Sequence, residues 1–203
     1  SSPFDETAVG FLEKLDCPAY KIASFEAVDL PLIACAAATG KPVIISTGMA
    51  NQQEIDAAVC GARKNGAGGL ALLHCVSAYP ALPEEANLRT IPHMMANFEV
   101  AVGLSDHTPG IGVAVASVAL GACFIEKHFT LSRDDGGPDA AFSLEPPGLE
   151  TLTRECHAAW EALGDVCYER TPGEKSNALF RRSLYVVKDI AQGEAFTEEN
   201  IRS

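Results

Sequence analysis

Five short apolar segments, each followed by a helical pattern, constrain the fold of this chain more than any other feature. The segments lie near residues 19–25, 42–47, 69–76, 101–107 and 124–130. Such alternation predicts parallel βα units, because parallel neighbours need a crossover connection. An eight-unit barrel takes about 250 residues, so five units within residues 1–168 predict an α/β fold, the later part (strands 4 to 8) of a TIM barrel. The alternative is an open doubly wound sheet, but no G-x-G-x-x-G motif follows any strand.

Capping signals place two of the helices between and after these strands. Asn51 with Glu54 three residues later predicts a capping box at the start of a helix over residues 52–66. The last helix of this region is expected over residues 149–164, beginning after the Pro-Pro pair that precedes it. The first of these helices then connects the second predicted strand to the third, and the other follows the fifth strand.

Polar side chains follow every predicted strand. In a barrel, the C-terminal ends of the strands form a single mouth. The polar residues at these ends are Ser24, Glu26, Ser46, Thr47, Ser77, Tyr79, Ser105, His107, Glu126 and His128. The sequence therefore predicts one polar site to which all five strands contribute. His74 has the opposite strand parity to Ser77, so we expect it to pack behind the mouth.

The two histidines at the ends of the last two strands are the clearest candidates for a metal site. His107 shares a strand face with Ser105, and His128 shares one with Glu126. Neighbouring strands lie about 4.8 Å apart, so two imidazoles at the same edge can share one metal ion. The alternative from periodicity alone is two unrelated histidines, one hydrogen-bonded and one exposed.

Charge and hydropathy exclude two classes of function. The formal net charge is −12, and no basic stripe is present that could neutralise the phosphates of a nucleic acid. No apolar run reaches the length needed to span a membrane. An anionic substrate would therefore need locally placed lysine, arginine or a metal ion.

The cysteines indicate a reducing compartment. Seven are present, an odd number without a C-x-x-C motif, which favours reduced thiols in a cytoplasmic protein over disulfides or structural zinc. Each cysteine is expected to be a small core or surface residue. The chain begins without methionine or a signal peptide and has no terminal cap, so it resembles a piece cut from a longer protein.

The C-terminal part breaks the strand and helix rhythm. Residues 169–182 are predicted to be a charged linker, and residues 183–203 the start of a small second domain. Within the latter we expect a strand in SLYVVK, a turn at QGE and a helix that begins at TEEN.

Motifs along the whole chain resemble the sialic-acid synthase family. They occur in the family's order and read YKIASFE, GKPVIISTGM, LLHCVSAYPA, VGLSDHT, IEKHFTL, GGPDAAFSLEP and SLYVVKDIAQGEAFTEENI. The resemblance implies a TIM barrel followed by an antifreeze-like (SAF) domain, of which this chain holds barrel strands 4 to 8 and the beginning of the second domain. It also suggests a homodimer in which the partner's SAF domain closes the active site.

The resemblance also implies a reaction. Family members condense phosphoenolpyruvate with the open aldehyde form of an N-acetylated amino sugar, which releases phosphate and gives a nine-carbon 2-keto acid. The motifs favour the branch that uses 2,4-diacetamido-2,4,6-trideoxy-L-altrose to make pseudaminic acid. An N-acetylmannosamine-type sugar, giving neuraminic or legionaminic acid, is the alternative within the family.

The family's functional residues map onto individual positions of this chain. A divalent metal, Mn²⁺ or Mg²⁺, is expected on His107 and His128, where it would polarise the aldehyde oxygen. Glu26 and Glu126 match glutamates suited to stabilising positive charge at C2 or accepting a proton from water. For each glutamate the alternative is a capping or salt-bridged carboxylate.

The remaining matches are binding residues. Phosphoenolpyruvate contacts are expected from Ser2, Lys21, Ser24, Ser46, Ser77 and Ser105, and sugar contacts from Tyr79 and Asp139. Lys21 and Ser24 have opposite strand parity, so both can face the mouth only with a bulge or a long reach of the lysine. Two other classes remain open: a non-catalytic sugar- or metal-binding remnant, and a different barrel enzyme with a histidine-bound metal, such as an aldolase that cleaves a keto acid.

Overall fold

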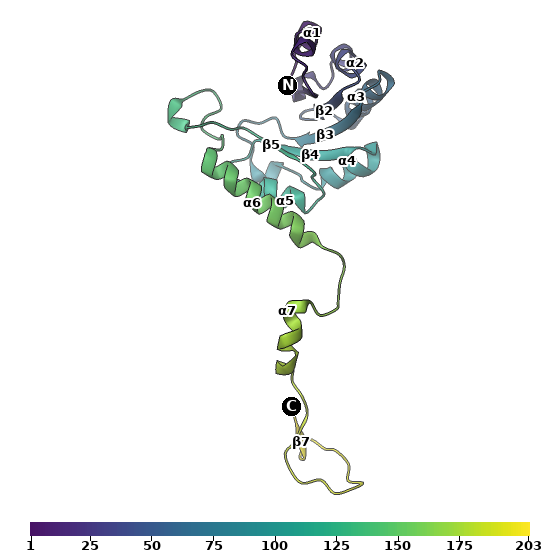
Figure 1. Cartoon of the computed structure of the whole chain (residues 1–203), viewed down its shortest axis with the longest axis vertical. Coiled ribbons are helices and arrows are strands. Elements are labelled where there is room, and N and C mark those ends of the chain that lie inside the picture. Colours follow the sequence, from purple (N-terminus) through teal and green to yellow (C-terminus); the bar gives the residue numbers. More distant parts are fainter. The chain divides into compact units, whose positions relative to one another are not determined.

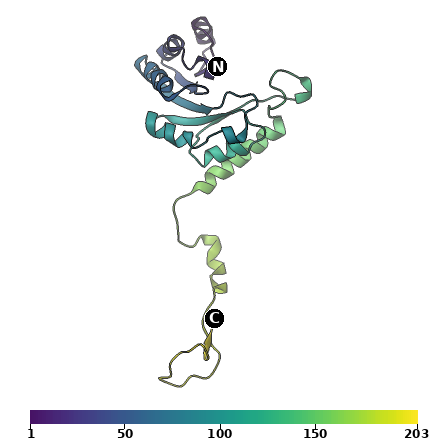
Figure 2. The ribbon, with the colours of Figure 1, turned by 180° about the vertical axis from the view of Figure 1, so that it is seen from behind.

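The computed structural model describes residues 1–203 as two compact units, Ser1–Gly164 and Asp165–Ser203. In the first unit, strands and helices alternate along the chain, as the sequence of colours in Figure 1 shows and Figure 2 repeats from behind. This is the alternation that the sequence predicts. None of the helices combines the length and the apolar character needed to cross a membrane.

All five predicted strands form one parallel sheet. In sheet order they are β1 (Tyr20–Ile22), β2 (Pro42–Ser46), β3 (Gly69–Cys75), β4 (Ala101–Asp106) and β5 (Ile125–Lys127). Sheet order equals chain order, so the strand order never reverses. A doubly wound sheet requires such a reversal, and the five strands therefore form the half-barrel predicted from the sequence.

One helix precedes the first strand and one follows each of the five strands, and together these helices bury one face of the sheet with their apolar side chains. They are α1 (Glu6–Lys14), α2 (Leu30–Ala38), α3 (Gln52–Lys64), α4 (Thr90–Phe98), α5 (Gly112–Val118) and α6 (Pro146–Leu163), with 3₁₀ turns η1 (Ser24–Glu26), η2 (Pro83–Glu85) and η3 (Arg133–Asp135). The predicted capping box is confirmed, because Asn51 Oδ1 accepts from Glu54 N at 3.1 Å and Glu54 Oε2 accepts from Asn51 N at 2.8 Å.

Strand alternation separates a core face from a polar face. Val43, Ile45, Leu72, Val102 and Leu104 belong to the apolar core shared with the helices. Their strand neighbours point the other way, and this second face carries Lys21, Ile44, Ser46, Cys75, Ser105 and Glu126, whose strands are in register at Lys21↔Ile44, Cys75↔Ser105 and Ser105↔Glu126. The face that would line the inside of a barrel is therefore the one with chemically reactive side chains.

Three predicted boundaries were wrong. The fifth strand was expected to reach residue 130, but β5 ends at Lys127, so His128 lies one residue beyond the strand. The first strand was expected to reach residue 25, but β1 ends at Ile22 and η1 follows it. The strand-parity conflict between Lys21 and Ser24 therefore disappears, since only Lys21 lies on the strand. Helix α6 begins at Pro146 rather than after the Pro-Pro pair, because the first turn of a helix needs no backbone N–H and accepts proline.

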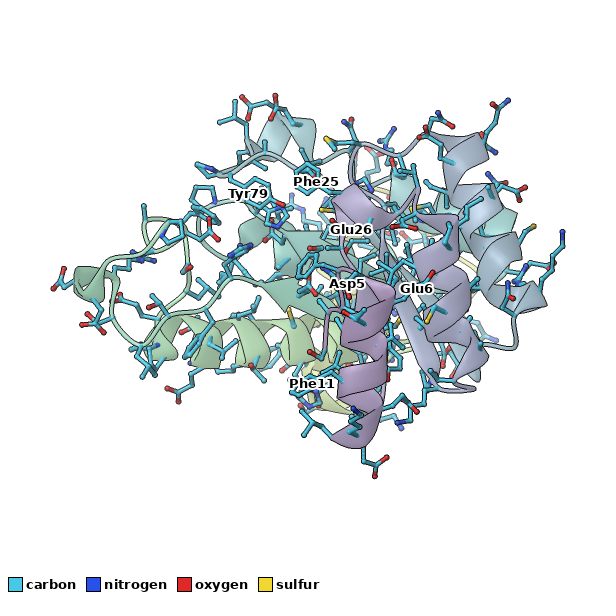
Figure 3. All side chains as sticks on the ribbon, turned by 90° about the horizontal axis from the view of Figure 1, so that it is seen from above. Asp5, Glu6, Phe11, Phe25, Glu26 and Tyr79 are labelled. Carbon is cyan, nitrogen blue, oxygen red and sulfur yellow. The ribbon has the colours of Figure 1, made fainter.

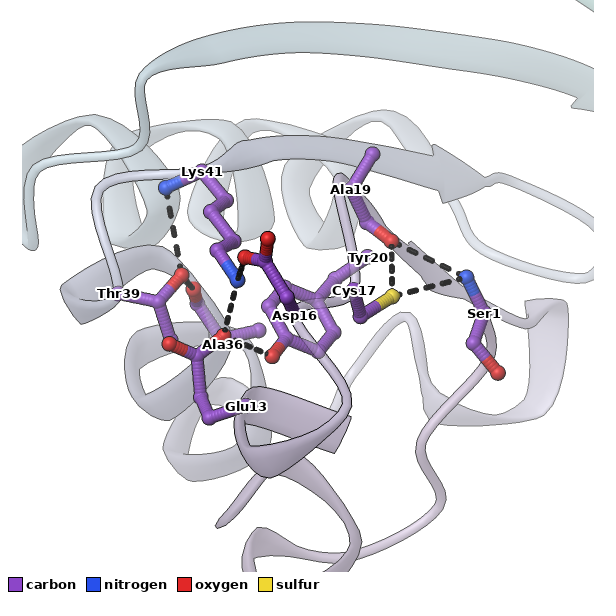
Figure 4. Close-up of polar contacts among 9 residues, drawn as sticks. All are labelled: Ser1, Glu13, Asp16, Cys17, Ala19, Tyr20, Ala36, Thr39 and Lys41. Carbon is purple, nitrogen blue, oxygen red and sulfur yellow. Dashed lines mark hydrogen bonds and ion pairs between the residues drawn. The ribbon is translucent and has the colours of Figure 1, made fainter. Parts of the chain in front are cut away.

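A cluster of paired charges lies at the N-terminal ends of β1 and β2 (Figure 4). The Tyr20 hydroxyl donates to the Glu13 carboxylate, and Lys41 Nζ lies 2.9 Å from Glu13 Oε1 and 3.5 Å from Asp16 Oδ1. Tyr20 itself is fully buried. The cluster ties α1 to the beginnings of two strands.

The second unit contains α7 (Pro172–Lys175), η4 (Ser176–Phe180) and an antiparallel pair, β6 (Tyr185–Val186) with β7 (Ile201–Arg202). The strand expected in SLYVVK is present but short. The helix expected at TEEN was wrong: Asn200 Oδ1 accepts from Thr197 N at 2.7 Å, which closes a single turn, and the chain then enters β7. The linker and domain boundaries at residues 169–182 and 183–203 stay predictions.

Candidate active site

Three strands contribute to a charged contact on the polar face. Ser105 Oγ donates to Glu126 Oε1 at 2.8 Å, and Lys21 Nζ lies 3.0 Å from the same oxygen. Lys21 belongs to β1 and Glu126 to β5, the opposite edges of the sheet. In a flat sheet these strands would lie about 19 Å apart, four spacings of about 4.8 Å. The sheet must therefore curve, and its concave side holds the site.

The two histidines come together with an aromatic side chain. The ring centroids of His107 and His128 are 5.2 Å apart, and the Tyr79 ring lies 4.3 Å from His107 and 6.0 Å from His128. Figure 3 draws all side chains and labels Tyr79 and Glu26. His128 Nδ1 lies 3.4 Å from Asp139 Oδ2. The structure thus brings together both predicted metal ligands and both predicted sugar-binding residues.

An oxygen atom lies next to Nδ1 of each of the two imidazoles. His107 Nδ1 donates to the Val76 carbonyl at 2.8 Å, and His128 Nδ1 faces the Asp139 carboxylate. A histidine whose Nδ1–H is held by an acceptor presents the lone pair of Nε2, which is the usual arrangement at metal sites. No group of three or more His, Cys, Asp and Glu side chains forms a complete metal site. The pair fits two positions of an open site whose other ligands would be water or substrate.

The environment separates the pKa values of the two imidazoles. Burial acts to lower the pKa of His107, but contacts with Cys75 and the Val76 carbonyl outweigh it and raise the pKa above its ordinary value. Burial, and then the charge of His107, lowers the pKa of His128. A pKa below the ordinary value favours the neutral form of His128 at pH 7, so its contact with Asp139 is not a full ion pair.

A second polar group surrounds Cys75, at the end of β3. Ser24 Oγ donates to the Cys75 sulfur at 3.4 Å and accepts from Gly48 N at 3.2 Å, while Ser77 Oγ lies 3.9 Å from the sulfur. A Cβ atom on Gly48 would lie 2.1 Å from Ser77 Oγ and 2.7 Å from Ser24 Oγ. Only glycine leaves room for both hydroxyls at this point.

The prediction that every cysteine is a core or surface residue did not foresee that Cys75 contacts residues of the site. It is buried, but its sulfur also lies 3.8 Å from His107 Nδ1. Burial acts to raise the pKa of the thiol, but hydrogen bonds to His107 and Ser24 outweigh it, so the pKa lies below its ordinary value. Strand alternation from Ser77 would have placed Cys75 on the polar face.

Two buried polar atoms on this side lack a hydrogen-bond partner. They are Ser46 Oγ, in a fully buried residue, and Glu26 Oε2. Most buried polar groups in proteins are satisfied, so an unpaired one needs an explanation such as a missing ligand. Both residues are predicted site residues.

The other predicted residues behave differently. Ser2 is half-buried beside β1, and its neighbour Ser1 accepts from Lys21 N at 2.8 Å through its carbonyl. His74 packs away from the site, as expected, with Nε2 2.6 Å from the Ala86 carbonyl.

Phe142 was not predicted as a site residue, but its ring lies 5.1 Å from that of His128. It belongs to the GGPDAAF motif, three residues after Asp139, and this position was the signal that could have identified it.

Comparisons with known proteins identify relatives of this chain. The sequence profile of the NeuB family matches residues 1–168. Pseudaminic acid synthase of Helicobacter pylori is 44% identical over 100% of this chain and 60% of its own length. N,N′-diacetyllegionaminic acid synthase of Campylobacter jejuni is 43% identical over 99% of this chain and 61% of its own length. The chain thus spans about three fifths of the length of these curated relatives.

A solved structure is also similar. The crystal structure of N-acetylneuraminic acid (sialic acid) synthetase from Leptospira borgpetersenii, in complex with citrate, matches with a TM-score of 0.80 and 35% sequence identity. The match covers 89% of this chain and 65% of that chain.

Proposed function

The chain belongs to the NeuB family, and on this premise we propose that the protein condenses phosphoenolpyruvate with an N-acetylated amino sugar and water, giving a nine-carbon 2-keto acid and phosphate. One observation carries the proposal. The Glu126 carboxylate contacts Lys21 and Ser105 from two other strands. Two residues later along the chain lies His128, whose ring is 5.2 Å from that of His107. A carboxylate that can accept a proton, next to two side chains that can hold a metal ion, suits such a condensation.

The histidine pair would hold a divalent metal ion, Mn²⁺ or Mg²⁺. When bound there, the metal would supply Lewis acidity to the aldehyde oxygen of the sugar. His107 would present Nε2 to it, because its Nδ1 donates to the Val76 carbonyl. The Asp139 carboxylate lies 3.4 Å from Nδ1 of His128 and would leave Nε2 of this residue free as well.

Glu126 would act on the reacting carbon of phosphoenolpyruvate. The C2–C3 double bond supplies the electron pair for the new bond between C3 and the aldehyde carbon, and C2 becomes electron-deficient. The former aldehyde oxygen takes up a proton and becomes a hydroxyl group. Water then adds to C2 and one of its protons passes to a carboxylate. The bond between C2 and the phosphate oxygen breaks as the second proton of that water passes to the leaving phosphate, and C2 becomes the keto carbon. Glu126, kept in place by Ser105 and Lys21, suits this role. Glu26, with its unpartnered Oε2, is the second candidate.

Phosphoenolpyruvate would bind along the serine-lined side of the mouth. Lys21 supplies a point charge, and Ser24, Ser46, Ser77 and Ser105 supply hydroxyl groups, with Ser2 nearby in the chain next to β1. The unpartnered Ser46 hydroxyl is the part of this set that most needs a ligand. Tyr79 and Asp139, on the histidine side, would contact the sugar.

The sugar we propose is 2,4-diacetamido-2,4,6-trideoxy-L-altrose, with pseudaminic acid as product. A legionaminic acid precursor is the second candidate, since the two curated relatives are 44% and 43% identical to this chain. We further propose that the protein acts in the cytoplasm as a homodimer, with a barrel of eight strands completed and an SAF domain continued outside these 203 residues.

The test is phosphate release by the full-length protein that carries this chain. It is incubated with Mn²⁺, phosphoenolpyruvate and either the altrose sugar or N-acetylmannosamine. Release with the altrose sugar, lost in His128→Ala and kept in His157→Ala, supports the proposal; His157 is an exposed histidine on α6 and serves as the matched control. Release with N-acetylmannosamine alone moves the substrate to the neuraminic branch. Release with neither sugar contradicts the proposed activity.

A further inference from the structure

A buried ion pair lies directly behind the two histidines. Lys127 Nζ is 2.7 Å from Asp106 Oδ2, and the side chains are 4% and 2% exposed. Asp106 immediately precedes His107, and Lys127 immediately precedes His128. Because successive strand residues point to opposite faces, the pair lies on the helix-facing side while the imidazoles face the mouth.

Hydrogen bonds extend this pair around His107. Asp106 Oδ1 accepts from Thr108 N at 2.9 Å and from Thr108 Oγ1 at 2.8 Å. Lys127 Nζ also donates to the Thr108 carbonyl at 2.6 Å. The residues on both sides of His107 are therefore tied to each other and to β5.

This contact lies where the pairing of β4 with β5 ends. The strand has only three residues, and its pairing with β4 ends at Asp106↔Lys127. Beyond that point, the His128 carbonyl accepts from Leu144 N at 2.8 Å, so the chain has already turned to another partner. The ion pair is the last link between β4 and β5 before their histidines.

Stability alone is a poor explanation for such a pair. Burying two charges costs desolvation energy, and apolar residues of similar volume often serve stability equally well. What an ion pair with fixed hydrogen bonds supplies, and apolar residues do not, is a defined distance between two backbones.

We propose that Asp106 and Lys127 are positioning residues that hold His107 and His128 at the separation required to share one divalent metal ion. This inference rests on the proposed function, since it concerns the metal pair of that site. The Asp106–Lys127 ion pair would thus affect metal affinity although it lies on the opposite side of the sheet from the metal.

The experiment measures the dissociation constant of Mn²⁺ by calorimetry on the full-length protein, without substrates. Lys127→Met removes one charge and leaves Asp106 with its two bonds from Thr108, while the double variant Asp106→Leu with Lys127→Met removes both charges. We expect each to bind Mn²⁺ about 10- to 100-fold more weakly than the wild type, as typical for the loss of a group that orients a ligand. Circular dichroism confirms the folded state at the temperature of the titration.

Two further variants keep the result interpretable. Lys41→Met breaks a lysine–carboxylate pair at the far ends of the strands, and its Mn²⁺ affinity should equal that of the wild type. Thr108→Val removes one donor to Asp106 with little change of shape. It should weaken binding by a smaller factor, and it decides the question if the charge variants do not fold.

The outcomes separate this inference from the proposed function. If the wild type binds Mn²⁺ and the folded Lys127 and double variants bind it equally well, the positioning role is wrong and the metal site stands. If only Lys41→Met matches the wild type, the role is supported. If the wild type binds no Mn²⁺, the metal site and the positioning role both fail.

Discussion

The polar groups at the two ends of the parallel sheet differ in how fully they are paired. At the N-terminal ends of β1 and β2, Glu13 pairs with both Tyr20 and Lys41, and Lys41 also reaches Asp16 (Figure 4). At the C-terminal ends, the buried Ser46 hydroxyl and one oxygen of Glu26 have no partner. One end is complete by itself, and the other leaves hydrogen-bonding capacity unused.

This difference separates stability from binding. In barrel enzymes, the N-terminal face of the strands serves stability and the C-terminal face carries the chemistry. An unsatisfied buried group lowers stability, so a fold tolerates one where a ligand makes up the missing bond. Substitutions at the two ends should therefore affect different measured quantities.

The largest effect is expected from Glu126→Gln. It preserves the size of the side chain but removes the charge that Lys21 and Ser105 hold in place. We expect kcat to fall at least about 10²-fold, the usual loss when a positioned proton acceptor is removed. Steady-state phosphate release measures it, with Glu155→Gln on the exposed side of α6 as control. Unchanged kcat would remove Glu126 from the chemistry.

A smaller effect is expected from Gly48→Ala. The new methyl group would displace the hydroxyls of Ser24 and Ser77, which lie 2.7 and 2.1 Å from its position. We expect KM for phosphoenolpyruvate to rise about tenfold, equivalent to about 1.4 kcal/mol, with little change in kcat. The control is Gly10→Ala in α1, where a methyl group meets no atom within 4 Å. An unaltered KM would argue against a ligand between the two serines.

Ser46→Ala tests the unpartnered hydroxyl. Removal of a buried group without a hydrogen bond should leave the free energy of unfolding unchanged or raise it by about 1 kcal/mol, while affinity for phosphoenolpyruvate falls. Ser117→Ala makes the matched comparison, because Ser117 is equally buried but donates to the Ala114 carbonyl at 2.6 Å and should lose stability. Denaturant titrations with and without phosphoenolpyruvate measure both quantities. If Ser46→Ala and Ser117→Ala lower the free energy of unfolding equally, the Ser46 hydroxyl is not an unsatisfied group.

The smallest effect is expected from Glu13→Gln. Its hydrogen bond from Tyr20, and then its contact with Lys41, lower the pKa of Glu13 below the ordinary 4.5. A carboxyl with a lowered pKa in the folded state stabilises the fold above its unfolded pKa and loses that contribution as the pH falls through the folded value.

The variant should therefore unfold at most about 4 °C lower at pH 7, because the Glu13 carboxylate reaches the solvent and such ion pairs contribute little. The difference in melting temperature from the wild type should disappear below pH 4.5. Thermal melts across this range measure the gap, and kcat should be unchanged. A gap that widens on acidification would reverse the sign of the linkage.

The sequence by itself determined the parallel strands, the capping box at Asn51 and the common face of Ser105, Glu126 and His128. These features depend on short-range periodicity and local hydrogen bonds, which neighbouring residues encode directly. The end of β1 was harder to predict, since Ser24–Glu26 continue an extended-looking pattern but close into a 3₁₀ turn.

Only the tertiary structure decided which distant residues meet. The contact between Lys21 and Glu126 requires a curved sheet, the place of Cys75 beside His107 requires the register of β3 against β4, and the pair Asp106–Lys127 requires that of β4 against β5. Curvature and register are set by packing between elements far apart in the chain. No local pattern contains that information, so the identity of the side chains was readable from the sequence while their partners were not.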